Sequence, residues 1–440
     1  MNKRIAIIST NQHLIPFGGL GSFIKGLNIV LKENNIVTDI VLDKEPSEKV
    51  FLEELNISGT VYYSDNVLSY SNHANTFAFK DSVNFEKTIN FRNALMKAMS
   101  KNIYDYIVIN SVEALDAVIA LGIGNYIPVI LYTHLEWMLG QKNKDQPFSD
   151  NMIEYYQKLM GMSNIIVATQ SKFNAKNIKN LYSDNVIVLP MPIPEEGLLT
   201  NSSKKREGIL FNGRWEPRKR PMEFIQLIKD TGLPARVMTS KKGAIKFEDA
   251  LKEIECEDYI IKHSLQGQNK VDFISSCVAQ YHPSLEENFP FAVLEGLCQL
   301  PVLVDGENVY WHKGFEEYEF NLIHSNKTNR ADIIKGIKKT NSNMVEYQNN
   351  AKKIWTKFLL NAKKDFTVTS NKFTNTECGF YDDFIKSLNR IPSIEDIGTC
   401  YRNKSNFNLY NFKEGTYYSK DSIDIETIEK ESTGIESFFE

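Results

Sequence analysis

Short, β-rich apolar runs alternate with longer stretches of helical spacing through the first half of the chain. A strand is predicted for each of these runs: Arg4 to Ile8, Val37 to Leu42, Tyr104 to Asn110, Ile127 to Tyr132, Asn164 to Thr169 and Val186 to Leu189. Strands that are separated by helices favour a parallel sheet with helices on both faces. The pattern therefore predicts a doubly wound, Rossmann-like α/β domain over residues 1–195.

The alternation restarts after Pro190, Pro192 and Pro194, which precede a polar stretch typical of a linker. New strands are predicted for Gly208 to Phe211, Ala235 to Thr239, Tyr259 to Lys262, Val278 to Tyr281 and Pro301 to Val304. A second Rossmann-like domain is therefore expected over residues 196–390. Two such sheets facing each other leave a cleft lined by the loops at the carboxyl ends of their strands. From residue 391 the periodicity fades, which predicts an acidic C-terminal extension over 391–440.

Composition agrees with a two-domain soluble protein. The chain has 440 residues, of which 42% are hydrophobic and 24% are charged. No apolar run approaches the ~18 residues of a membrane span, and the N-terminal run is too short for a signal peptide, so a cytoplasmic protein without a membrane partner is expected. The five cysteines are widely spaced and form no Cys-x-x-Cys, so neither a disulfide framework nor a zinc site is predicted. The last twenty residues carry a net charge of −6, more than the whole chain's −4.

Two carboxylates lie eight positions apart where a predicted strand ends. Glu287 lies in the loop after His282-Pro-Ser, and Glu295 lies on the helix that follows. One carboxylate can bind sugar hydroxyls while the other reaches a ribose. The alternative is a solvated loop carboxylate and an unrelated helix carboxylate.

A basic segment follows the first strand of the second predicted domain and reads Phe-Asn-Gly-Arg-Trp-Glu-Pro-Arg-Lys-Arg over residues 211–220. A diphosphate group needs fixed positive charge, in the ground state and more so as it departs as a leaving group. Arg214 and Lys219 are the candidates for this role. Arg218 and Arg220 are assigned to a basic surface loop, which is also the alternative for the whole segment.

Together the two segments resemble the retaining GT-B glycosyltransferases, which carry Glu-x7-Glu in their C-terminal domain. The resemblance implies a GT-B fold in which Glu287 contacts the donor sugar, Glu295 binds the donor ribose, and Arg214 and Lys219 bind the diphosphate. Asn288 and Phe289 are expected to line the same donor site, and the turn at Leu265 resembles the loop whose backbone contacts uracil. Pro290 departs from the family, because many members have glycine there and proline has no N–H to donate.

The first predicted domain offers candidate residues after two of its strands. Gly18 and Gly19 lie between the first strand and a helix, where backbone amides can approach an anion or a sugar closely. His134 and Glu136 follow another strand and could orient a sugar or accept a hydrogen bond from an acceptor hydroxyl. The alternative for the two glycines is a tight turn between strand and helix, and the alternative for His134 is a structural role.

By the same resemblance, the product keeps the donor's anomeric configuration, and no cofactor or metal is expected because Arg214 and Lys219 supply the positive charge. The donor is expected to be a UDP-sugar such as UDP-glucose or UDP-arabinose. Short segments, including the one around His134, are similar to phage DNA α-glucosyltransferases, and Lys241, Lys242 and Lys246 could meet phosphates. Transfer to hydroxymethylcytosine in duplex DNA is therefore predicted. The alternatives are transfer to a bacterial polysaccharide or glycoconjugate, and a non-catalytic binding protein.

The acidic tail ends in a short apolar motif. Ile435, Phe438 and Phe439 have the spacing of one side of a helical turn. The spacing resembles the peptides by which replication and modification enzymes bind a ring-shaped sliding clamp. Such a tether would raise the enzyme's concentration at DNA. The alternative is that the aromatic side chains pack on the protein's own surface.

Overall fold

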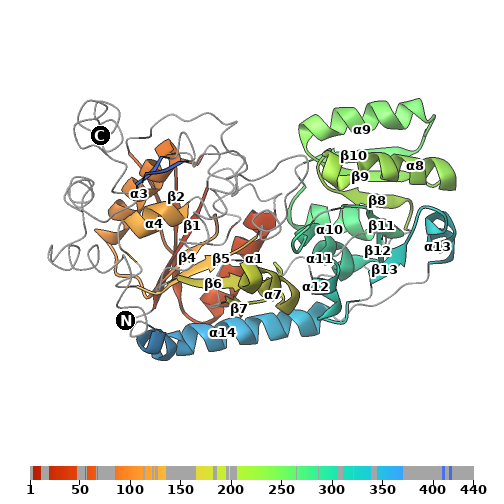
Figure 1. Ribbon diagram of the computed structural model, residues 1–440. Coiled ribbons are helices and arrows are strands. Elements are labelled where there is room, and N and C mark those ends of the chain that lie inside the picture. The colour runs from red at the N-terminus through yellow and green to blue at the C-terminus, as the bar shows by residue number, and fades with distance from the viewer. Residues whose placement is uncertain are drawn as a thin grey trace.

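The chain forms two parallel α/β sheets that are joined by a long C-terminal helix (Figure 1). The computed structural model describes residues 3–10, 19–46, 55, 57–65, 67, 85–111, 114–120, 123, 127–134, 165–181, 186–194, 198, 206–263, 265–285, 287–305, 311–320, 322–337, 344–369, 409–411 and 416–418. Gly18, Glu136, Ile435, Phe438 and Phe439 lie outside these residues.

The first sheet has seven parallel strands in the order β3-β2-β1-β4-β5-β6-β7. Its strands are β1 (Arg4–Ser9), β2 (Val37–Leu42), β3 (Val61–Tyr63), β4 (Tyr106–Ile109), β5 (Val129–Tyr132), β6 (Ile165–Thr169) and β7 (Val186–Val188). The accompanying helices are α1 (Gly19–Glu33), α3 (Phe85–Met99), α4 (Leu115–Ala120) and α7 (Lys172–Leu181). β4 and β5 are buried at every position, as expected where helices cover both faces of a sheet.

The second sheet repeats this plan with six parallel strands in the order β10-β9-β8-β11-β12-β13. Its strands are β8 (Ile209–Asn212), β9 (Ala235–Thr239), β10 (Tyr259–His263), β11 (Ala279–His282), β12 (Val302–Asp305) and β13 (Leu322–Ser325). Its helices are η6 (Pro217–Lys219), α8 (Pro221–Thr231), α9 (Lys241–Glu253), α10 (Gly267–Ser275), α11 (Phe291–Gln299), α12 (Lys313–Glu316) and α13 (Arg330–Gly336). The α/β class and the two Rossmann-like sheets predicted from the sequence are confirmed.

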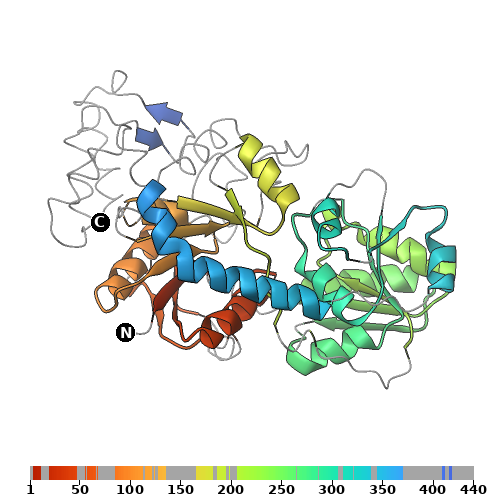
Figure 2. The same ribbon diagram turned by 90° about the horizontal axis from the view of Figure 1, so that it is seen from below.

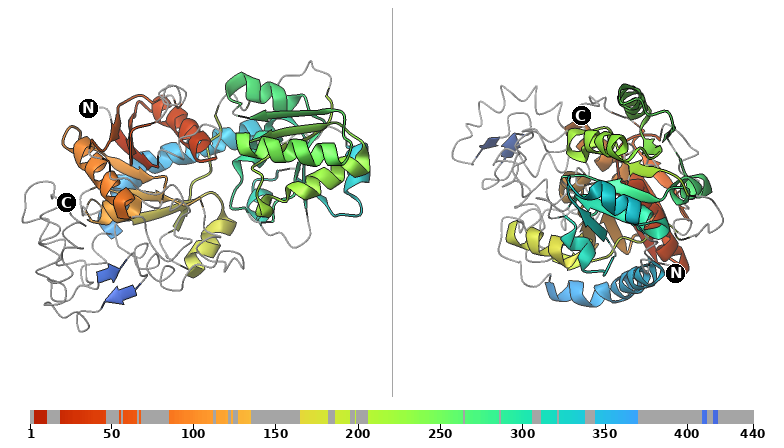
Figure 3. Two further views of the ribbon diagram at one scale, coloured as in Figure 1. Left: turned by 90° about the horizontal axis from the view of Figure 1, so that it is seen from above. Right: turned by 90° about the vertical axis from the view of Figure 1, so that its right-hand side faces the viewer.

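Helix α14 (Met344–Thr369) returns from the second sheet to the first (Figure 2). Trp355 Nε1 donates to the backbone oxygen of Pro190 over 2.8 Å, and Lys3 Nζ donates to the oxygen of Leu359 over 2.9 Å. Viewed from above, α14 bridges the two sheets (Figure 3). A chain segment that the sequence assigned to the second domain thus packs on the first, while the domain limits at 195, 196, 390 and 391 stay predictions.

One hydrophobic cluster contains side chains from both halves, including Phe23 and Trp355 beside Phe289 and Phe291. The two halves therefore share part of their core.

In the predicted extension the structure describes a small antiparallel pair, β14 (Leu409–Asn411) with β15 (Thr416–Tyr418). Among the described helices, none has both the length and the apolar character needed to cross a bilayer.

Candidate functional site

In each sheet the strand order reverses beside the first strand of its half, between β1 and β4 and between β8 and β11. Open parallel sheets bind ligands at this switch point, outside the carboxyl ends of the strands. The loop after β8 carries Arg214 and Lys219, and the loop after β11 carries Glu287. Three of the residues singled out in the sequence therefore lie on the two loops that flank one switch point.

Lys219 and Glu287 form an ion pair across these two loops, with side chains only 13% and 7% exposed. His282, the last residue of β11, places its Nε2 3.1 Å from the same Glu287 oxygen. Because a carboxylate only accepts hydrogen bonds, His282 Nε2 is the donor. The sequence left His282 as a structural or peripheral residue, whereas the structure places it directly beside Glu287.

The charges of this cluster follow from burial and from the neighbours. Burial by itself would raise the pKa of Glu287, but Lys219 and His282 outweigh it and hold the pKa well below its usual value. Burial lowers the pKa of His282 despite the pull of Glu287, so the ring is neutral at pH 7. Burial also lowers the pKa of Lys219, which Glu287 opposes. The cluster is therefore a lysine and a carboxylate that depend on each other for their charged forms.

Backbone contacts hold the two loops together. Arg218 O accepts hydrogen bonds from Leu285 N at 2.9 Å and from Ser284 Oγ at 3.2 Å. Arg220, at a left-handed φ of 51°, joins η6 to α8 and pairs with Asp305 at 2.6 Å. The assignment of Arg220 to a basic surface loop is wrong, because its side chain is largely buried among acceptors and fixes the loop that carries Lys219.

The second carboxylate of the motif has its own polar partners. Glu295, on α11, pairs with Lys270 Nζ at 2.5 Å and accepts from Asn212 Nδ2 at 3.2 Å. Asn212 is the last residue of β8, so Glu295 faces the same switch point as Glu287. Lys270 lies on α10 and was not singled out in the sequence.

Arg214 differs from Lys219 in exposure. Its side chain is 65% exposed and pairs with Glu216 at 3.1 Å, while Arg218 pairs with the other oxygen of Glu216 at 3.0 Å. An exposed guanidinium held by one surface carboxylate can turn toward an anionic ligand at little cost. Arg214 is thus free to move toward a ligand, whereas Lys219 is held within the loop by Glu287.

The remaining donor-side candidates use their side chains for packing. Phe289 stacks on Phe315 with ring centroids 4.1 Å apart, and Leu265 packs against the hydrophobic core. Asn288 Nδ2 donates to Gln170 Oε1 of the first domain over 2.9 Å. Ligand contacts by Phe289 would therefore have to come from its backbone, and Asn288 links the loop after β11 to the opposite domain.

In the first domain, His134 follows β5 and lies 2.8 Å from Asn110 Oδ1 through its Nε2. Its ring meets Phe23 edge-on at 5.1 Å, which fixes the plane of the imidazole. Gly19 begins α1 against α11, where an added Cβ would lie 3.3 Å from Phe291 Cβ. The glycine permits this close approach of the two domains, and its role in ligand binding stays a prediction, as do those of Gly18 and Glu136.

The two-sheet architecture matches several solved structures over most of the chain. Sucrose-phosphate synthase from Thermosynechococcus elongatus superimposes with a TM-score of 0.58 at 13% identity, covering 84% of this chain and 100% of that one. Anabaena HepE in complex with UDP-glucose gives 0.55 at 13% identity, with the same coverage. A variant of S. aureus TarM, solved with fondaparinux, α-GlcNAc-glycerol and UDP, gives 0.53 at 11% identity over 85% of this chain and 100% of that one.

The chain has the GT-B fold. At such low identity the likeness carries the fold alone. No protein-family model matches the chain, and no curated protein matches it significantly in sequence. The GT-B fold expected from the two motifs is confirmed, while the resemblance to phage DNA α-glucosyltransferases stays a prediction.

Proposed function

We propose that this GT-B protein is a glycosyltransferase that moves a sugar from a UDP-sugar to a hydroxyl of a polysaccharide or glycoconjugate, with retention of configuration. The observation that carries the proposal is the Lys219–Glu287 pair on the two loops of the β8/β11 switch point. Opposite charges placed there suit a ligand with an anionic diphosphate next to a hydroxyl-rich sugar. The UDP and UDP-glucose bound to HepE, and the UDP bound to TarM, support a donor of this kind.

Each residue has a distinct task in the proposed reaction. Lys219 and Arg214 offset the charge of the diphosphate, which grows as the bond to the sugar breaks. Glu287, kept anionic by Lys219 and His282, accepts hydrogen bonds from sugar hydroxyls. Glu295 accepts a hydrogen bond from a hydroxyl of the donor ribose. A phosphate oxygen of the departing UDP takes the proton of the acceptor hydroxyl on the same face of the sugar, which accounts for retention without a protein nucleophile.

Donor binding and transfer can be tested separately. Isothermal titration with UDP should show binding by the wild type that falls at least ~10-fold in Arg214→Ala, because a charge-assisted contact is lost. Lys229→Ala, an exposed lysine on α8, is the matched control and should bind like the wild type. Radiolabelled UDP-sugars, supplied with oligosaccharide and glycoconjugate acceptors, then report transfer, and NMR of the product reports its anomeric configuration. Absence of UDP binding by the wild type contradicts the donor assignment.

A DNA acceptor is the second candidate, favoured by one observation. Lys241, Lys242 and Lys246 are exposed on the first turns of α9, which begins at the carboxyl edge of β9. This is the edge at which Glu287 and Arg214 lie. Three lysines on one rim suit contacts to phosphates along a duplex, and such contacts weaken as salt rises.

The two acceptor classes are separated by one comparison. Transfer to hydroxymethylcytosine duplex, to plain duplex and to oligosaccharides is measured for the wild type and for the triple alanine variant of these lysines. A DNA acceptor requires transfer to the modified duplex that falls in the triple variant and with added salt. Transfer to saccharides alone, unchanged by the triple substitution, supports the first proposal.

A further inference from the structure

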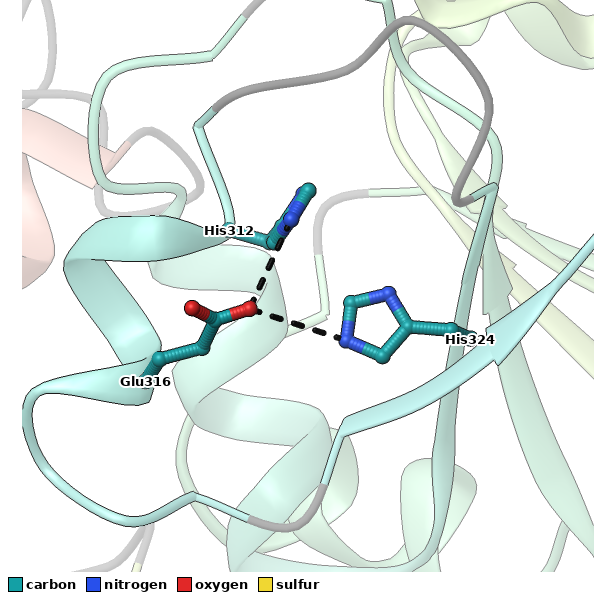
Figure 4. Close-up of side chains that lie close together, drawn as sticks. All are labelled: His312, Glu316 and His324. Atoms are coloured by element: carbon teal, nitrogen blue, oxygen red, sulfur yellow. Dashed lines mark ion pairs between the residues drawn. The ribbon is translucent and has the colours of Figure 1, made fainter.

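Two histidines and a glutamate gather where α12 meets β13 (Figure 4). His312 caps α12, Glu316 lies one turn later on the same helix, and His324 lies on β13. One potential ligand atom from each residue lies within 4.8 Å of the other two. Figure 4 shows both imidazole rings beside the same carboxylate oxygen.

The contacts within this cluster are too long for good hydrogen bonds. His312 Nε2 lies 3.5 Å from Glu316 Oε1, and His324 Nε2 lies 3.9 Å from the same oxygen. Among the described residues, His312 Nδ1 is buried and has no hydrogen-bond partner. The nitrogen of His312 that faces the cluster is Nε2, and it has no good hydrogen bond to Glu316 either, so it is available to a further ligand.

We propose that His312, Glu316 and His324 bind one Zn²⁺ ion, with water as the fourth ligand. Imidazole nitrogens and a carboxylate oxygen are zinc ligands, and three of them with an open position form a known type of site. Around a tetrahedral zinc, ligand atoms lie about 3.3 Å apart, because each metal–ligand bond is about 2.0–2.2 Å long. The separations of 3.5 and 3.9 Å from Glu316 Oε1 therefore need only small shifts, which this 53% exposed side chain can make. The two histidine nitrogens lie within 4.8 Å of each other and must also approach.

The two imidazole rings are close neighbours. The ring centroids of His312 and His324 lie 4.8 Å apart in an edge-to-face arrangement. Both rings face the same Glu316 oxygen, so one ion could contact all three side chains.

An ion at this place would fix α12, the helix through which the second domain contacts the start of α7 in the first domain. Glu317, the residue after α12, accepts a hydrogen bond from Lys172 N at 2.7 Å and another from Phe173 N, at the start of α7. Gly314 packs so closely on Ser171 that an added Cβ would lie 2.9 Å from its Oγ. Zinc would tie α12 to β13 and so stabilise this domain contact. The site is separate from the proposed donor site at Glu287.

The experiment measures zinc uptake by the metal-free chain in competition with a chromophoric chelator. We expect one Zn²⁺ per chain for the wild type and a loss of at least ~10-fold in affinity for His312→Ala and for His324→Ala, because each removes a ligand. His263→Ala, an exposed histidine of β10 in the same domain, is the matched control and should bind like the wild type. Zinc at ~100 times its dissociation constant should raise the melting temperature by about 5 °C in the wild type and the control only.

Glu316→Gln covers the case in which a histidine variant fails to fold, because Glu316 is half-exposed and the substitution keeps its shape. It should fold like the wild type and bind zinc at least ~10-fold more weakly. Equal zinc affinity in the wild type, Glu316→Gln and the folded histidine variants would overturn the proposal, as would no uptake by the wild type. UDP binding serves as an independent readout, so failure of the zinc site leaves the donor assignment intact.

Discussion

Asn288 donates a hydrogen bond of 2.9 Å to Gln170, and this bond joins the loop that carries Glu287 to the opposite domain. Gln170 follows β6, and its Oε1 also accepts from Thr169 Oγ1 at 2.9 Å and from Asn174 Nδ2 at 3.2 Å. The amide of Gln170 is thus fixed by its own domain before Asn288 meets it. The loop after β11 is therefore positioned partly by the first sheet.

This relationship predicts coupled effects of substitution at the two positions. Asn288→Ala frees the loop and should lower kcat/KM for the donor by about 5-fold, since a buried hydrogen bond contributes about 1 kcal/mol. Gln170→Ala should have a similar effect, and the double variant should lose little more than either single one. A double-mutant cycle of transfer rates measures this coupling. Strictly additive losses would mean that Asn288 contacts the donor by itself.

Arg214→Ala should abolish most transfer without affecting the fold. The Arg214 side chain is 65% exposed, and its partner Glu216 retains a second ion pair with Arg218. The free energy of unfolding should therefore change by less than about 0.5 kcal/mol. Loss of a charge-assisted contact to the leaving diphosphate should slow transfer by roughly 30- to 1,000-fold. Urea denaturation and transfer kinetics check the two parts, and wild-type turnover in the folded variant would contradict the phosphate role.

Glu287→Gln should lose transfer to the same degree but should also destabilise the protein. Its carboxylate is 7% exposed and holds the charge of the buried Lys219, so the substitution leaves an ammonium without a counter-charge. Breaking a buried pair in this way costs about 3 kcal/mol. Differential scanning calorimetry should therefore separate the two variants. Equal melting temperatures for Arg214→Ala and Glu287→Gln would show that Lys219 does not depend on Glu287.

The strands were predictable because the two parallel sheets bury nearly all positions of their central strands. Ile5 to Ile8 and Val302 to Val304 read as continuous apolar runs for this reason. The two strands of these parallel sheets that were missed lie at the sheet edges. β3 has only three residues, and β13 carries the polar His324 and Ser325, so neither forms such a run.

The site was predictable only where residues are close in sequence or match a family motif. The sequence singled out Glu287 and Lys219, but the contact of His282 with Glu287 depends on how the loop after β11 folds back onto that strand. Lys270 meets Glu295 across 25 positions, a contact that no local spacing reveals. For the proposed zinc site a signal was present in the spacing His-x3-Glu-x7-His, but this segment holds no cysteine and so lies outside any cysteine pattern.

The acid sensitivity of the second domain should depend on Glu223. Burial alone would raise the pKa of this carboxyl, yet contacts with Arg330, Lys327 and Arg220 lower it to about 2. The pKa of Glu223 in the folded protein thus lies below its ordinary value near 4.5. Its contribution to the stability of the folded state is therefore complete above pH 4.5 and is lost as the pH falls toward about 2. Arg220 also fixes the loop that carries Lys219, so this network supports the proposed donor site.

Glu223→Gln should therefore lower the free energy of unfolding by about 2 kcal/mol at pH 7, with a smaller difference from the wild type at pH 3.5. Urea unfolding at the two pH values measures both differences. Glu248→Gln is the control, since Glu248 forms a half-exposed pair with Lys252 that should contribute little at either pH. A difference between Glu223→Gln and the wild type that grows on acidification would contradict this assignment.

Discrimination between UDP and its 2′-deoxy form should depend on Glu295. Asn212 and Lys270 hold this carboxylate at the end of β8, on the edge where the nucleotide is expected. A carboxylate that accepts from the ribose 2′-hydroxyl contributes about 1.5–3 kcal/mol, so the wild type should bind UDP about 10- to 100-fold more tightly than dUDP.

In Glu295→Ala this preference should disappear, mainly through weaker binding of UDP, while the affinity for dUDP changes much less. Glu253→Ala, an exposed carboxylate near the end of α9, should keep the preference of the wild type. Isothermal titration of both nucleotides into the three proteins gives the comparison directly. If Glu295→Ala still prefers UDP by the wild-type ratio, Glu295 does not contact the 2′-hydroxyl and its pairing with Lys270 is structural.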